Sequence, residues 1–66
     1  MSMTKKEAMK QLLMYLTMLR NRSIEIMEES SQPLSKEREE TLSLELSVIH
    51  MCLQHLMEVE KKIRGM

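Results

Sequence analysis

A single break, at residues 30–35, divides the sequence into two long segments with helical periodicity. Its serines and Pro33 disfavour helix continuation, because proline moves the preceding residue, Gln32, away from the α region. A linker of about six residues suits two antiparallel helices. The sequence therefore predicts an all-α fold, an antiparallel two-helix hairpin that forms a single domain over residues 1–66.

The first segment predicts a helix over about residues 5–29. Thr4 and Glu7 have the spacing of a capping box, in which both side chains satisfy backbone donors at a helix start. The predicted seam steps along the segment by four and three residues, through Met9, Leu12, Leu16, Leu19, Ser23 and Ile26. Such a heptad-like seam favours side-by-side packing at a shallow angle.

The second segment predicts a helix over about residues 36–63. Ser35 is its expected N-cap, and Gly65 follows its expected end. Its seam is more regular and runs through Leu42, Leu46, Ile49, Leu53, Leu56, Glu60 and Ile63. The two seams are expected to face each other in the hairpin.

Both helices carry more apolar surface than one seam requires. Nine of the twelve residues from Ala8 to Leu19 are apolar, and a helix that is apolar nearly all round needs contacts on more than one side. Tyr15 lies on the same face as Leu12 and Leu16, but we count it with the apolar residues that are available to a partner. We predict that the surplus binds a partner, with these candidate residues: Leu13, Met14, Tyr15, Met18, Val48, Met51, Cys52 and Val59.

Association is the expected route to stability. A chain of this size buries only about 60% of the surface that its unfolded form exposes. Cys52 is the single cysteine, which excludes an internal disulfide and suits a reducing cytoplasm. Two hairpins joined in a four-helix bundle would cover the leftover stripes. A heterologous partner would cover them too, because methionine-rich faces adapt to helices and grooves.

The charge balance and hydropathy narrow the choice of partner. Ten acidic and ten basic residues cancel, whereas nucleic-acid binding requires a surplus of Lys and Arg. The longest apolar run, Leu12–Leu16, is far shorter than the roughly 20 residues of a membrane span. No apolar stretch follows the basic start of the chain, residues 1–6, so no export signal is expected. These features predict a cytoplasmic protein that neither binds nucleic acid nor inserts into a membrane.

The charges also give the hairpin a polarity. Its open end is expected to be basic, with Lys5, Lys6, Lys10, Lys61, Lys62 and Arg64. Its turn is expected to be acidic, with Glu25, Glu28, Glu29, Glu37, Glu39 and Glu40. Six carboxylates so close together repel one another modestly in water. The turn is therefore either a solvated acidic tip or a docking point for a basic surface.

No catalytic residue, metal site or cofactor is expected. His50 and Cys52 point about 200° apart on a helix, so they cannot bind one ion without a second chain. A zinc site needs three or four converging ligands. Cys52 and His55 are neighbours on one face, but two helices provide no closed pocket around them. We interpret Cys52 as a packing residue, His50 as the edge of the seam and His55 as a surface residue.

Residues 11–50 resemble the small E-type co-chaperones of type III secretion systems. The similarity rests on Gln11-Leu12-x-Met14-x-Leu16-Thr17-x-Leu19 followed by Arg20, and on the pattern Leu42, Leu46, Ile49-His50. Members of that family are helical hairpins that join a helical-repeat chaperone and hold the needle subunit unpolymerised in the bacterial cytoplasm. The turn departs from the family, which tends to have glycine where this chain has Ser-Ser-Gln-Pro. The resemblance implies a co-chaperone whose partners are the helical-repeat chaperone and the needle subunit.

A second resemblance is to the small sporulation phosphatases of bacilli, which are also hairpins and dephosphorylate response regulators. It rests on Leu19-Arg20, on Leu34-Ser35 and on Ser43-Leu44-Glu45-Leu46-Ser47. The signature of that family reads Ser-Gln-Glu-Leu-Asp, so Leu44 and Ser47 replace its glutamine and aspartate. Hydrolysis requires a polar group that orients the attacking water. This resemblance therefore implies a regulator that binds without catalysing, and a self-associating helical adaptor is a further alternative.

Overall fold

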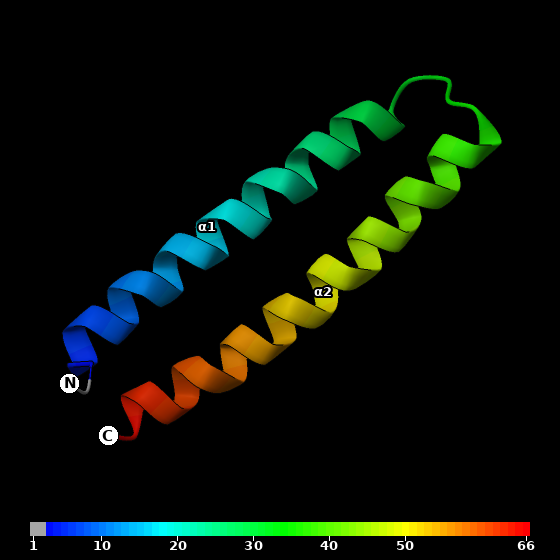
Figure 1. Cartoon of the computed structure of the whole chain (residues 1–66). Coiled ribbons are helices and arrows are strands. Elements are labelled where there is room, and N and C mark those ends of the chain that lie inside the picture. Colours follow the sequence, from blue (N-terminus) through cyan, green and yellow to red (C-terminus); the bar gives the residue numbers. More distant parts are fainter. Residues whose placement is uncertain (1–2) are drawn as a thin grey trace.

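The computed structural model describes residues 3–66, which form two antiparallel helices joined by a short turn (Figure 1). Helix α1 spans Lys5–Ser30 and helix α2 spans Lys36–Arg64. The predicted hairpin is confirmed, and each helix ends one residue later than its pattern indicated. Met1 and Ser2 lie outside the described residues. They are part of the predicted domain and of the segment in which no export signal is expected.

Each helix begins directly after a residue whose side chain caps it. The Thr4 hydroxyl accepts a hydrogen bond from the Glu7 backbone N–H at 3.1 Å, and the Ser35 hydroxyl accepts one from Arg38 at 3.2 Å. Both caps have extended backbone, as N-caps require. Gly65 follows α2 as expected, but its φ of −78° lies in the ordinary right-handed region. The conformational freedom of glycine is therefore not used there.

The core consists of the predicted seams. Five hydrophobic side chains are buried, and all belong to those seams: Leu12, Ile26, Leu42, Ile49 and Ile63. Each contributes about 1.5–3 kcal/mol on burial. Ile26 and Leu42 have almost no exposed surface, and Leu34 from the turn packs against this same cluster. The sequence pattern did not identify Leu34, because it lies outside both helical periodicities.

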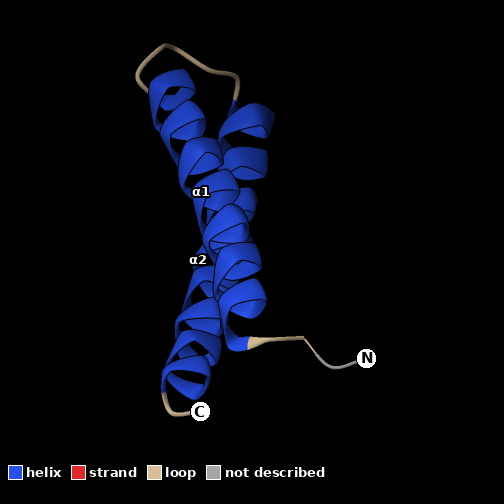
Figure 2. Ribbon diagram, turned by 90° about the vertical axis from the view of Figure 1, so that its left-hand side faces the viewer, coloured by secondary structure: helices blue, strands red, loops and turns tan. Residues whose placement is uncertain are grey.

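The molecule is long and thin, with principal extents of 47 × 19 × 15 Å. The helices lie side by side in Figure 1 and cross each other in the side view of Figure 2. At the open end the Lys5 ammonium donates a 3.5 Å hydrogen bond to the backbone carbonyl of Met66. In residues 3–66, neither helix is both long and apolar enough to cross a membrane.

Candidate protein-binding groove

More large hydrophobic side chains are exposed than buried in residues 3–66. The exposed ones are Met3, Leu13, Met14, Tyr15, Met18, Ile24, Met27, Leu44, Val48, Met51, Met57 and Met66. A stable monomer seldom exposes large apolar patches to water, so the positions of these side chains relative to one another matter. The surplus inferred from the sequence is therefore a feature of the folded hairpin.

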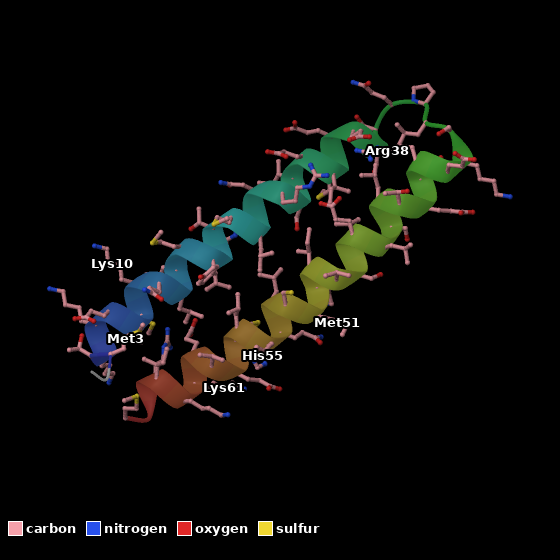
Figure 3. All side chains as sticks on the ribbon, viewed as in Figure 1. Met3, Lys10, Arg38, Met51, His55 and Lys61 are labelled. Atoms are coloured by element: carbon pink, nitrogen blue, oxygen red, sulfur yellow. The ribbon has the colours of Figure 1, made fainter. Side chains whose placement is uncertain are left out.

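An open apolar groove of about 580 Å³ lies between the two helices near the middle of the hairpin. Both helices contribute side chains to it, namely Tyr15, Met18, Leu19, Met51, Cys52, His55 and Leu56. We call this feature the mid-length groove. Leu19 and Leu56 are half-buried, whereas Met18 and Met51 stand at its sides with 64% and 69% of their surface exposed. Figure 3 shows Met51 and His55 on α2.

A smaller hollow of about 220 Å³ continues the mid-length groove towards the open end. The two share Tyr15 and Leu56, so the apolar surface is continuous. Ala8 from α1 and Val59 from α2 line this second hollow. The apolar face thus extends from the centre of the hairpin to its open end.

The same flank of the hairpin becomes charged towards the turn. Arg22 donates two hydrogen bonds to the Glu45 carboxylate, the one from Nη2 to Oε1 measuring 2.9 Å. Arg38 pairs with Glu29 in the same bidentate way, with an Nη2–Oε1 distance of 2.9 Å. Arg22 also reaches Glu25 at 3.0 Å. Figure 3 marks Arg38 beside the turn.

These ion pairs shift the titration of their members in the expected directions. Hydrogen bonds from Arg22 lower the pKa of Glu45, and those from Arg38 lower the pKa of Glu29. Because each carboxylate stabilises the guanidinium opposite, the pKa of both arginines is raised. The pairs are about one-third exposed. They therefore act chiefly by favouring one register between the helices.

A spacing of seven residues connects the charged half of this flank with the apolar half. On α1 the flank carries Ala8, Tyr15, Arg22 and Glu29, and on α2 it carries Val59, Cys52, Glu45 and Arg38. The two observed ion pairs set the register, and the same register places Tyr15 opposite Cys52. Sequence reasoning missed both ion pairs and the role of His55, although the seven-residue spacing on each helix was the available signal.

The structure brings most of the predicted partner-binding residues together. Tyr15, Met18, Met51 and Cys52 line the mid-length groove, and Val59 lines the adjoining hollow, where it is half-buried.

The other three predicted residues lie elsewhere on the surface. Met14 lines a hollow on α1 that it shares with Tyr15 and Met18. Leu13 lies beside Lys10 and Met14 on another side of the same helix. Val48 is 59% exposed and does not line the mid-length groove. The candidate surface therefore consists of the groove, of hollows on α1 that adjoin it through Tyr15 and Met18, and of Val48 apart from both on α2.

Two expectations for individual residues require correction. Cys52 was interpreted as a packing residue, but its side chain is exposed in the single chain because it lies beside the seam rather than within it. The turn was expected to hold six mutually repelling carboxylates, but Arg38 pairs with Glu29. The acidic character of the turn therefore rests on its other glutamates.

The polar and titratable side chains of residues 3–66 form no metal-binding cluster, and several of them are held by hydrogen bonds. No three His, Cys, Asp or Glu side chains gather in a way that could hold a metal ion in this part of the chain. The Glu45 carboxylate is held by Arg22, and the Ser47 hydroxyl donates to the Ser43 carbonyl at 3.1 Å. His50 is exposed, and His55 borders the groove. This arrangement presents apolar surface, with the Cys52 thiol and His55 on the lining of the groove.

Comparison of the chain with protein-family models, curated proteins and solved structures gave no match.

Proposed function

We propose that this chain is a protein-binding co-chaperone that takes an apolar helical surface of its partner into the mid-length groove. The observation that carries the proposal is that both helices expose apolar side chains around one continuous groove. Helix-in-groove recognition uses this kind of surface, in which anchors from one helix enter an apolar channel. The exposed methionines suit this role because their side chains adapt to the shape of a partner.

The resemblance to type III secretion co-chaperones gives the proposal a specific form. The partners would be the helical-repeat chaperone and the needle subunit, and the complex would form in the bacterial cytoplasm. The hairpin fold is compatible with that family. Within the resembling segment, Leu19 lines the mid-length groove and Met14 lines the adjoining hollow on α1. Such a protein acts by binding, and the proposal includes no catalytic step.

The test is reconstitution with the helical-repeat chaperone and the needle subunit from the same organism. We expect the three chains to elute together in size-exclusion chromatography and to yield a defined affinity by calorimetry. Met18→Glu should weaken binding about tenfold or more, because it places a charge in a desolvated contact. Circular dichroism should show that this variant keeps its helices, because Met18 is exposed in the free chain.

Met27→Glu is the matched control. Met27 lies on the same helix and is 66% exposed, close to the 64% of Met18, but it does not line the mid-length groove. Its binding should remain within about twofold of the wild type, as expected for a surface position away from the contact. Failure of the wild-type chain to bind the chaperone, with or without the needle subunit, would refute the secretion assignment. Equal losses in both methionine variants would place the binding surface elsewhere.

A further inference from the structure

The position of the groove along the hairpin suits a second copy of this chain. Helix α1 has 26 residues and α2 has 29, so Met18 and Met51 lie close to the midpoint of each helix. A two-fold axis that crosses the hairpin at this point would place the groove of one chain over the groove of the other. The two hairpins would then overlap along their full 47 Å. A groove near either end would lack this property.

The distribution of charge determines the direction of the second copy. Residues 25–40 at the turn carry six glutamates against two cations, whereas residues 3–10 and 58–66 at the open end carry six cations against three glutamates. Two hairpins placed antiparallel bring the acidic turn of each beside the basic open end of the other. Two hairpins placed parallel bring like charges together at both ends, which raises the energy of the assembly.

The size of this face is close to that of a stable interface. A stable protein interface covers about 800 Å² on each partner, and the hairpin offers a face 47 Å long and 15–19 Å across. The groove provides the apolar centre of that face, ion pairs lie towards the turn, and lysines and Arg64 stand around the apolar hollow at the open end. This distribution, an apolar core within a polar rim, is typical of specific interfaces.

We propose that the chain forms an antiparallel homodimer, a four-helix bundle whose two-fold axis passes through the mid-length groove near Met18 and Met51. In this dimer Met18 and Met51 of each copy enter the groove of the other. The inference concerns the chain alone and can be tested without any partner. Because the proposed heterologous partner would occupy the same mid-length groove, the dimer and that complex exclude each other.

Sedimentation equilibrium of the purified chain tests the association. We expect a dimer at about 100 μM, with a dissociation constant in the micromolar range or below. Met51→Glu should raise that constant at least tenfold, because the dimer would bury two like charges at its centre. Met57→Glu is the matched control, since Met57 lies on the same helix, is 58% exposed and does not line the groove. A monomeric wild-type chain, or equal effects of both variants, would overturn the proposal.

The direction of the two copies is tested by a distance measured between spin labels at the turn. The label is attached to Gln32→Cys in a Cys52→Ala background, after sedimentation has verified that this variant dimerises. The antiparallel dimer places the two labels at opposite ends, separated by about the 47 Å length of the hairpin. A much shorter distance would reveal a parallel dimer and overturn the orientation. As a second readout, raising the salt concentration should weaken an antiparallel dimer and strengthen a parallel one.

Discussion

On one flank of the hairpin, single residues decide whether the two helices leave an open groove or are joined by an ion pair. Positions seven residues apart on α1 carry Tyr15 and then Arg22, and the positions opposite them on α2 carry Cys52 and Glu45. The first opposed pair leaves an apolar groove open, and the second closes the flank with a bidentate ion pair. The side chain at an equivalent position thus determines whether the flank serves binding or register.

The ion pair between Arg22 and Glu45 predicts an acid-sensitive contribution to stability. Because the pKa of Glu45 is lowered from the ordinary 4.5 in the folded state, its contribution is present above that value and is lost as the pH falls through the lower one. Glu45→Gln should therefore destabilise the protein at about pH 7 and have a much smaller effect at about pH 3. Urea unfolding followed by circular dichroism at both pH values provides the measurement.

Glu58→Gln is the control for this experiment, because Glu58 is exposed on the same helix and forms no ion pair within residues 3–66. Its effect should be small at both pH values. A Glu45→Gln effect that is equally large at acidic and neutral pH would show that the side chain contributes by packing rather than by charge.

At the scale of the helices, the ion pairs favour one alignment and oppose its neighbours. In the observed register Arg22 lies opposite Glu45, and Arg38 lies opposite Glu29. If one helix slipped by seven residues in one direction, Arg22 would lie opposite Arg38. If it slipped by seven residues in the other direction, Glu29 would lie opposite Glu45. Like charges in such positions are destabilising. The alternating signs therefore specify the register that also forms the groove.

Charge reversal tests this pairing between elements. Glu45→Arg should lower the midpoint of thermal unfolding, because it places two guanidinium groups against each other across the helices. Arg22→Glu added to the same chain should recover most of that loss by restoring an opposite pair, although the Arg22–Glu25 contact is not restored. Glu58→Arg provides the single-substitution control. Additive losses in the double variant would mean that the two residues are not coupled in solution.

The whole molecule has more surface than it can use alone. Five buried hydrophobic side chains form its core, while twelve large ones remain exposed in residues 3–66. A thin hairpin presents a large surface for its volume. Its stability and its proposed function therefore both depend on contacts that its surface makes with another chain. The groove lies at mid-length and the ends have opposite charge, which makes the same face suitable for a second copy and for a helical partner.

At this scale we also expect the chain to be inactive as a phosphatase. Adding it to phosphorylated response regulators should leave the rate of phosphate loss unchanged, because Arg22 holds the Glu45 carboxylate and the Ser47 hydroxyl is bonded within its own helix. Release of inorganic phosphate over time measures this directly. An acceleration that disappears in Glu45→Gln would contradict the expectation and favour the resemblance to the sporulation phosphatases.

The sequence by itself determined the features that depend on local interactions. Thr4 and Ser35 marked the helix starts because caps act within one turn. The buried residues were predicted because a helix repeats its faces every three to four residues. The surplus of apolar surface could be inferred in the same way. So could the polarity of the hairpin, because charges near each terminus and near the turn follow directly from an antiparallel chain.

Only the tertiary structure decided which of the surplus residues meet. Tyr15 and Met18 join Met51 and Cys52 in one groove, while Leu13 faces a different side. Such meetings depend on the register between two helices, and a shift of one residue rotates each flank by about 100°. The turn, the interlocking of the seams and the opposed ion pairs fix that register together. Periodicity within each helix identified the apolar stripes, but the packing of one helix on the other turned them into a site.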